Sequence, residues 1–400
     1  MTDWNLYSFQ NYVRDTFPSF ERSLNDQQDG RSASSITIDT SDLVFSFFFQ
    51  TLLGQTSIHQ LDQWLRGSMA DELFERNASD PNGSDSTLLD AVDGWNLSDI
   101  RRSARHLVHS LRRQGSLSID LPGQQTVRPA ALDGSDFGGH LFSVLTYPGA
   151  DVQAVGDLEP YDTLGDERGA SFQLLQRFKQ SDETVGFTHL LLDGLYMNRS
   201  SFLRGIEMGF DPVIKTTQEE LTCVQILQTL WADHQADENL PDSVTVIEGE
   251  DPCRGFEYEA LQHPHIKWNG LTLNGIQIHI THTAGRFKGQ TETYWVFTSD
   301  QTLSARALRQ LAHHRWAIEN NQFKELNELV GSKSGYIQSS AKKHVILFWQ
   351  MIGWALFQAF RDHCRALLES MNYGYSMTKS WLIERLKEQT YERMANGPPA

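Results

Sequence analysis

The apolar positions of the first 120 residues recur at helical spacing. The clearest run contains Phe45, Phe48, Phe49 and Leu52, which fall on one side of a helix, and a similar spacing follows around Leu61. The segment 43–53 is too short to cross a bilayer and includes polar residues, so the pattern predicts a buried helix. We therefore expect a helical N-terminal region.

The pattern changes near residue 126, where short apolar runs separated by Gly-rich turns predict strands. Residues 188–192 are largely apolar, which is typical of a central buried strand. We expect strands over 126–132, 141–147, 152–155, 188–192 and 212–215, and helices over 171–178 and 201–208. This order, strand–strand–strand–helix–strand–helix–strand, predicts an α/β layer fold of the ribonuclease H type.

The remainder combines a β-rich segment with helices. Residues 243–298 alternate apolar and polar positions after a helix over 221–234, and helices are expected over 304–330, 342–371 and 377–394. The fold class is thus a ribonuclease H-like mixed-sheet core, interrupted by a β-rich insertion and flanked by helical regions. The expected divisions are 1–120 (helical, DNA binding or dimerisation), 121–235 (first part of the core), 236–300 (insertion), 301–340 (core helix) and 341–400 (C-terminal helices).

Two readings stay open for the basic stretch that ends the N-terminal region. Short helices around Leu88 and over 97–113 carry an arginine cluster from Arg101 to Arg113. They fit a helix-turn-helix, in which arginines contact DNA. They fit equally a helical bundle with a solvated arginine face.

Composition limits the function classes without identifying a partner. The net charge of −17 argues against a generic nucleic-acid binder, because phosphate contacts need Lys and Arg. The last hundred residues are an exception, with 13 Lys and Arg against 8 Asp and Glu. The cysteines Cys223, Cys253 and Cys364 show no zinc-ligand spacing and no disulfide framework, and the N-terminus lacks a signal-peptide pattern. We expect a cytoplasmic protein with no membrane segment.

Three carboxylates stand where metal-dependent phosphodiester chemistry would need them. Asp133 follows the apolar run at 130–132, Asp193 follows the one at 189–192, and Glu319 lies in a helical segment. Carboxylates at the carboxyl ends of neighbouring strands meet at one edge of a sheet. Mg²⁺ prefers oxygen ligands, and a pair of Mg²⁺ ions assists both the attacking and the leaving oxygen of a phosphodiester. Arg315 is one helical turn before Glu319, where it would contact a phosphate.

Each of these residues also has an ordinary structural interpretation. Asp-Gly after a strand is a common turn signal, and the pair Arg315 and Glu319 could be an exposed salt bridge on an amphipathic helix. Several other carboxylates compete for the same roles, and Asp136 is the strongest competitor for the first position. The competitors are Asp136, Asp162, Asp166 and Asp300.

Taken together, the motifs resemble those of bacterial insertion-sequence transposases of the DDE class, specifically the insertion-sequence-four type. The resemblance covers roughly residues 120–360. It is carried by Leu-Asp-Gly-Ser at 132–135, by Leu-Leu-Leu-Asp-Gly-Leu-Tyr-Met-Asn at 190–198, and by His-Arg-Trp-Ala-Ile-Glu-Asn-Asn at 314–321. Two positions depart from the signature of the third block. Its Tyr would fall at Ala312, and its Lys would fall at Leu326.

The resemblance implies a cut-and-paste DNA transposase. Asp133, Asp193 and Glu319 would hold two Mg²⁺ ions, for which Mn²⁺ can substitute. The partners would be double-stranded DNA, as terminal inverted repeats and target, and a second copy of the chain in the bacterial cytoplasm or nucleoid. Trp268 or Trp295 would stack on a displaced base or pack in the core, the core being the favoured place. The DNA-contacting residues would be Arg309, His313, His314, Arg315, Lys324, Lys342 and Lys343.

Two other functions share the same residues. A catalytically inactive descendant would bind transposon ends without cutting them. A ribonuclease H-like nuclease would cut DNA but never join it. The presence of all three carboxylates favours the transposase.

Overall fold

A computed structural model describes residues 4–27, 31, 38–53, 55, 57–74, 85–123, 125–180, 186–251, 255–317, 339–370 and 379–396. The chain divides into two compact units, each discontinuous in sequence. Unit 1 comprises residues 1–117, 134–174 and 320–400, and unit 2 comprises residues 118–133 and 175–319. Strand β3 (Pro129–Asp136) contains the boundary after Asp133. The five sequence segments set out above stay a prediction.

Unit 1 is mainly helical. Its N-terminal helices are α1 (Leu6–Thr16), α2 (Pro18–Asn25), α3 (Thr40–Leu53), α4 (Ile58–Leu65), α5 (Ser68–Leu73), α6 (Asp85–Gly94) and α7 (Leu97–Arg113). The later part contributes the antiparallel strands β4 (Leu141–Pro148) and β5 (Gln153–Tyr161), the start of α8 (Glu167–Gln180), and the helices α13 (Ser340–Ser370) and α14 (Lys379–Asn396).

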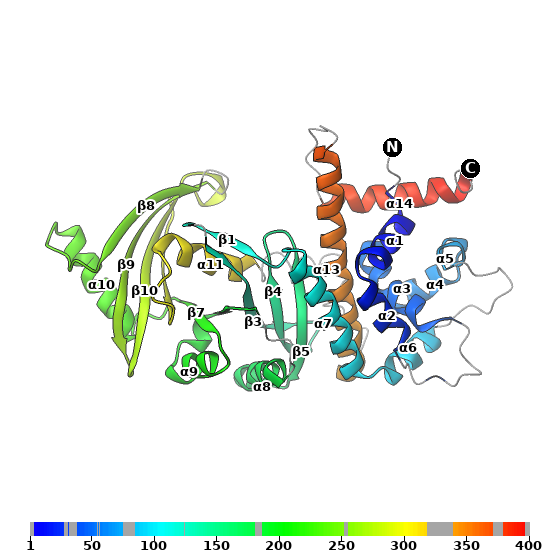
Figure 1. Cartoon of the computed structure of the whole chain (residues 1–400), viewed down its shortest axis with the longest axis horizontal. Coiled ribbons are helices and arrows are strands. Elements are labelled where there is room, and N and C mark those ends of the chain that lie inside the picture. The colour runs from blue at the N-terminus through cyan, green and yellow to red at the C-terminus, as the bar shows by residue number, and fades with distance from the viewer. Residues whose placement is uncertain are drawn as a thin grey trace. The chain divides into compact units, whose positions relative to one another are not determined.

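The predicted buried helix is α3, and its partner is the long helix α13 (Figure 1). Phe45, Phe48 and Phe49 are at most 1% exposed, as expected for the apolar side of a buried helix. Gly353 of α13 lets the two helices approach closely, because a Cβ there would lie 2.6 Å from the Phe48 ring. No helix within the described ranges is long and apolar enough to cross a membrane.

The contacts of two α7 arginines favour a helical bundle over a helix-turn-helix for this segment. Arg101 Nε donates to Asp157 Oδ1 of β5 at 2.7 Å, and Arg102 pairs with Asp99 of its own helix. The apolar side of α7 packs on α2 and β5. These contacts assign two of the basic side chains to structural ion pairs.

Unit 2 is built on a sheet in which neighbouring strands follow the order β3-β6-β7-β11-β10-β9-β8. The strands are β6 (His189–Leu192), β7 (Asp211–Thr216), β8 (Thr245–Asp251), β9 (Phe256–Trp268), β10 (Leu271–His282) and β11 (Thr291–Thr298). β3, β6 and β7 run parallel, whereas β7 and β11 and the strands beyond them pair antiparallel. The inserted strands therefore extend the core sheet.

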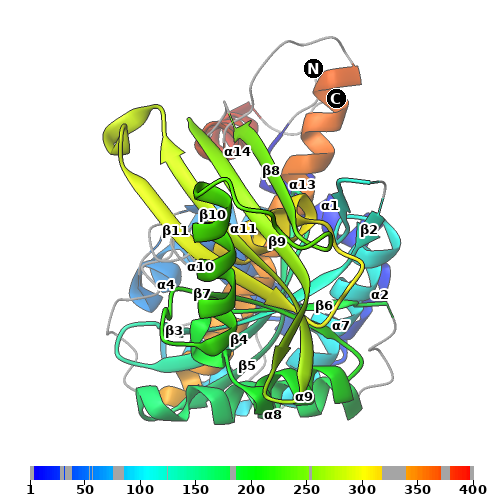
Figure 2. The same cartoon turned by 90° about the vertical axis from the view of Figure 1, so that its left-hand side faces the viewer.

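Helices and short strands complete unit 2. They are α9 (Arg199–Glu207), α10 (Thr222–Gln235), α11 (Ala305–Ala317) and the hairpin of β1 (Ile119–Leu121) with β2 (Gln125–Val127). Helix α10 lies along β9 and β10 (Figure 2). The turn between β9 and β10 is formed by Asn269 and Gly270, both with positive φ, as a two-residue hairpin turn requires.

The predicted α/β fold class is confirmed. Along the chain, β3, β4, β5, α8, β6, α9 and β7 follow one another in the expected strand–helix order. One expected strand, 126–132, is instead divided. β2 ends at Val127 and β3 begins at Pro129, because a proline has no N–H to continue a ladder and restricts the residue before it.

Candidate functional site

Asp133 and Asp193 lie at corresponding positions on neighbouring parallel strands. The register pairs Ala131 of β3 with Leu191 of β6, so each aspartate is two residues beyond a paired position. Asp193 follows the last residue of β6, whereas β3 continues to Asp136, so Asp133 lies within its strand. The two carboxylates reach the same edge of the sheet, as the strand pattern predicted.

The side chain of Asp193 is fixed by the backbone that follows it. Its Oδ1 accepts a hydrogen bond of 2.9 Å from the N–H of Leu195 and so caps a short 3₁₀ turn, Gly194–Tyr196. Gly194 packs closely on Thr216 of β7, and its carbonyl accepts from Gln218 Nε2. The second oxygen, Oδ2, lies 3.8 Å from Arg315 Nη2.

Arg315 of α11 joins the two aspartates. Its Nη2 donates to Asp133 Oδ1 at 3.1 Å and lies 3.8 Å from Asp193 Oδ2. Asp133 and Arg315 are 8% and 6% exposed, so this ion pair is buried, whereas the Asp193 side chain is 35% exposed. α11 therefore places a cation between two carboxylates that are 60 positions apart in sequence.

The glycine after Asp133 has a packing role and does not mark a turn. A Cβ at Gly134 would lie 2.4 Å from the Glu167 carboxylate and 2.6 Å from the Tyr161 hydroxyl. Successive side chains on a strand point to opposite faces, so Glu167 packs on the face opposite to that of Asp133. Asp136 also faces away from the side of Asp133. It is exposed, and its Oδ1 accepts from the N–H of Gly139.

The third predicted carboxylate, Glu319, lies outside the described residues, as does Lys324. Their roles stay predictions. The donor set that the structure does bring together contains only carboxylate oxygens, which are the ligands Mg²⁺ prefers. Both carboxylates also reach a common positive group, so a cation at this edge fits the residues present.

A pocket of about 260 Å³ lies beside α11 in unit 2. Its rings come from β9, β10 and β11 and from the loop that follows β10, and its positive side chains come from β7 and α11. Lys215 Nζ lies 4.1 Å from the centre of the Tyr294 ring, and the Arg309 guanidinium lies 4.1 Å from that of Tyr258. The pocket is lined by Lys215, Phe256, Ile280, His282, Phe287, Glu292, Tyr294, Arg309, Ala312 and His313.

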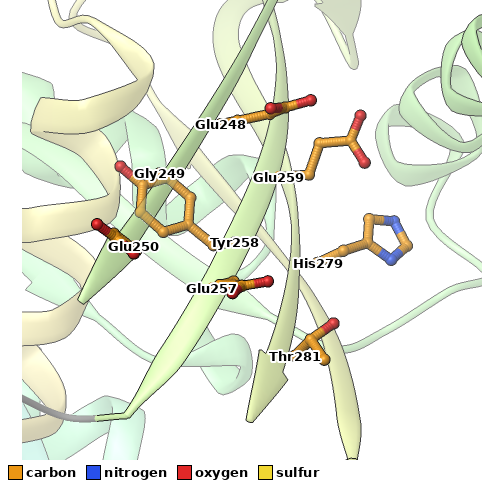
Figure 3. Close-up of a pocket in the computed structure, with 8 residues that line it drawn as sticks. All are labelled: Glu248, Gly249, Glu250, Glu257, Tyr258, Glu259, His279 and Thr281. Carbon is orange, nitrogen blue, oxygen red and sulfur yellow. The ribbon is translucent and has the colours of Figure 1, made fainter. Parts of the chain in front are cut away.

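The opposite face of the same strands is acidic. Glu248 of β8 is opposite Glu259 of β9, and Glu250 is opposite Glu257, so like charges face each other across the pair. These carboxylates, with His279 and Thr281, line a hollow of about 520 Å³ (Figure 3). Tyr258 projects on the other side of β9 from its neighbours Glu257 and Glu259 (Figure 3).

Each face carries its own helix. On the acidic face, α10 contributes Trp231, which stacks on His279 at 3.9 Å, and His234, which contacts Glu259 at 2.9 Å. On the other face, α11 contributes Arg309 over Tyr258. Burial lowers the pKa of His279, so its ring adds little positive charge to the acidic hollow at neutral pH.

The remaining predicted DNA contacts have mixed environments. Arg309 and His313 line the pocket beside α11, and His314 is partly exposed. Lys342 forms a 2.7 Å ion pair with Asp93, and Lys343 is only 2% exposed. Contacts of these side chains with DNA stay predictions, and burial makes Lys343 the least accessible of them.

Trp268 and Trp295, the two tryptophans considered for stacking, are core residues. They are 5% and 3% exposed, and the indole N–H of Trp295 donates to Gln277. Among the rings that line the pocket, Phe287 is 41% exposed and Tyr294 is 8% exposed. The sequence did not indicate them, because only the pairing of β9, β10 and β11 brings them together.

Burial lowers the pKa of Lys343 to about 8, and the nearby Asp136 only partly offsets that effect. Above pH 10.5 this lysine is neutral in both the folded and the unfolded protein, so its burial costs no charge. As the pH falls from 10.5 to about 8, where the buried amine becomes protonated, the folded protein loses stability. We therefore expect Lys343→Met to raise the free energy of unfolding at pH 7 by roughly 1–3 kcal/mol. Urea denaturation from pH 7 to 10 should show this gain shrinking as the pH rises. Lys342→Met is the control, and an equal, pH-independent gain in both variants would contradict the assignment.

Comparisons with known proteins give one finding and two negative results. No protein-family model matches the chain, and no curated protein matches it. Among solved structures, the chain is similar to a piggyBac transposase in a synaptic complex with hairpin DNA, determined by cryo-EM. The identity is 11% and the TM-score is 0.41, and the alignment covers 100% of this chain and 83% of that chain. At that level the similarity carries no argument about activity, which must rest on the site.

Proposed function

We propose that this protein is a DDE-type transposase of the insertion-sequence-four type, which cuts DNA at transposon ends and joins the freed strand to target DNA. The observation that carries the proposal is the meeting of Asp133, Asp193 and Arg315. Two carboxylates from adjacent parallel strands and one guanidinium from α11 converge at the edge of the sheet. Open α/β sheets bind their ligands at this edge.

Asp133, Asp193 and Glu319 would hold the divalent ions, Mg²⁺ or Mn²⁺. When bound, such ions stabilise the charge that develops on a phosphodiester and assist deprotonation of the attacking hydroxyl or water. We expect Arg315 to have a role both in the free protein and in the complex with DNA. Its guanidinium neutralises the two aspartates, and in the bound complex we propose that it shifts to contact a phosphate oxygen of the DNA.

The two faces of the inserted sheet support one orientation of DNA. Phosphates would be repelled by the glutamate face and attracted by the face of α11, where Lys215, Arg309 and His313 line a pocket with aromatic walls. The pocket is smaller than the roughly 300–1,000 Å³ of typical small-molecule sites, so it suits a single nucleotide of a DNA strand.

The signature's Tyr and Lys are absent from the helix, but the pocket contains a tyrosine and a lysine from other elements. The helix has Ala312 where the signature has Tyr, and it has no Lys at Leu326. The pocket instead contains a tyrosine from β11, Tyr294, and a lysine from β7, Lys215, both beside Ala312. Ala312 lines the same pocket, in which the Tyr294 side chain is 8% exposed.

Neutralising the positive side chains of the pocket should reduce the salt dependence of DNA binding. For Lys215→Gln or Arg309→Gln, we expect the slope of log affinity against log salt to fall by about one unit. The matched control is Glu257→Gln combined with Glu259→Gln, which changes charge on the opposite face and should leave the slope unchanged. Fluorescence anisotropy with a labelled duplex at several salt concentrations measures both. A larger change in the glutamate variant would contradict the orientation.

The reaction itself separates this proposal from its alternatives. Inverted repeats flanking the gene, with short direct duplications outside them, would supply the DNA substrate. Incubation of that end with Mg²⁺ and a supercoiled target should yield cut ends and joined products. Cutting without joining would indicate a nuclease, and binding without either would indicate an inactive descendant. Light scattering of the DNA complex would test the expected homodimer.

A further inference from the structure

A second group of metal-ligating side chains lies at the opposite end of the parallel strands. His189 begins β6, Asp211 begins β7, and Asp300 follows β11. Their nearest ligand atoms all lie within 4.8 Å of one another. His189 and Asp193 are four positions apart, or about 13 Å along a strand, so this group is distinct from the carboxylates of the proposed DNA site.

Each of the three side chains also contacts a neighbouring hydroxyl group. Thr188 Oγ1 lies 2.8 Å from His189 Nδ1, and Ser299 Oγ donates to Asp211 Oδ1 at 2.9 Å. Thr302 donates to Asp300 Oδ1 through both its N–H and its hydroxyl, at 2.7 and 2.6 Å. This leaves His189 Nε2, Asp300 Oδ2 and a carboxylate oxygen of Asp211 for a shared partner. Outer hydrogen bonds of this kind orient the ligands of protein metal sites.

The spacing and burial of the group fit a small divalent ion. His189 Nε2 and Asp300 Oδ2 are 3.2 Å apart. Two ligands at about 2.0–2.1 Å from a tetrahedral Zn²⁺ are about 3.3 Å apart. The His189 side chain is 3% exposed and that of Asp300 is 12% exposed, so water competes weakly for the ligand atoms. One imidazole with two carboxylates favours Zn²⁺ over Mg²⁺, which prefers oxygen ligands alone.

We propose that His189, Asp211 and Asp300 bind a Zn²⁺ ion as its three protein ligands. The two carboxylates carry two negative charges, which a divalent ion would neutralise. The ion would join the starts of β6 and β7 to the loop that leads into α11. Because α11 carries Arg309 and Arg315, the site would fix where that helix begins relative to the strands that carry the proposed DNA site. The inference does not depend on the proposed function.

The test uses the full chain, stripped of metal by a chelator, in an Asp193→Asn background that weakens binding at the other carboxylates. Titration with ZnCl₂, followed by calorimetry, should show one equivalent bound and a rise in melting temperature. Co²⁺ in place of Zn²⁺ should give visible absorption bands typical of nitrogen and oxygen ligands. Neither readout requires DNA or activity.

Variants separate a metal site from a plain His189–Asp300 ion pair. Asp211→Asn keeps the shape of the side chain and an oxygen for Ser299, and we expect it to weaken Zn²⁺ binding by at least about a hundredfold. Ser299→Ala should weaken it by about tenfold, since outer-shell partners contribute roughly 10–100-fold. His279→Gln, a histidine elsewhere in the same unit, should have no effect. The proposal is overturned if Zn²⁺ neither binds stoichiometrically nor stabilises the protein, or if Asp211→Asn binds Zn²⁺ as the parent does. Either result leaves the ion pair as the explanation.

Discussion

Replacing Asp133 or Asp193 by Asn should reduce metal-dependent cleavage of a transposon end by at least about a thousandfold, which is about 4 kcal/mol of transition-state stabilisation. Asparagine keeps the size of the side chain but removes the charge that would hold a divalent ion. End binding should persist, because neither aspartate supplies a positive charge to DNA. Cleavage of a labelled duplex, measured alongside a gel-shift assay, distinguishes the two effects.

Asp136→Asn is the matched control for the first carboxylate. It changes an aspartate only three positions away, which points to the other face of β3 and accepts a hydrogen bond from Gly139. We expect cleavage close to that of the parent. If Asp136→Asn abolishes cleavage and Asp133→Asn does not, the assignment of Asp133 is wrong. If all three variants cleave normally, the proposed function fails.

Replacing Arg315 by Gln should weaken the binding of DNA and strengthen the binding of divalent ions. The variant loses a phosphate contact, so cleavage and end binding should both weaken. It also removes the cation that lies between Asp133 and Asp193, and the two carboxylates then repel each other. Removing one partner of a fully buried ion pair costs roughly 3–5 kcal/mol. Because Asp193 is partly exposed, we expect a loss of about 1–3 kcal/mol.

Divalent ions should restore much of that stability. With the guanidinium gone, Mg²⁺ or Mn²⁺ no longer competes with it at the two carboxylates, so either ion should raise the melting temperature of Arg315→Gln more than that of the parent. Arg306→Gln, an exposed position on the same helix, is the control and should respond to metal as the parent does. An Arg315→Gln protein whose melting temperature is insensitive to both ions would contradict a shared cation position.

The strand pattern predicted the core of the fold because burial and alternation are local properties of the chain. The largely apolar segment before Asp193 predicted a central strand, which is β6, and the run over 43–53 predicted a buried helix, which is α3. The hairpin of β1 and β2 was not predicted, because three residues are too few to show a period. The break before Pro129 was visible in the sequence but was read as the middle of a longer strand.

The site was predictable only where its residues follow strand ends. Asp133 and Asp193 meet because parallel strands bring equivalent positions to one edge, and Arg315 lies on the helix that the sequence associated with them. The pocket with Tyr294 and Lys215 depends on which strands of the insertion pair, and in which register. The group around His189 depends in addition on where the loop after β11 returns. Which strands become neighbours, and where the loop after β11 returns, depends on residues far apart in the sequence, so no local pattern shows it.

Each of the two units contains a buried cysteine whose reactivity can report on local unfolding. Cys223 lies in α10 of unit 2 and Cys364 in α13 of unit 1, and burial raises the pKa of each to about 12. A buried thiol at this pKa reacts with an alkylating reagent only when its helix opens, so its labelling rate reports the local free energy of opening. In a Cys253→Ser background, the two rates would show whether the units unfold together or separately. The cooperativity of unfolding can thus be measured with thiols that the chain already contains.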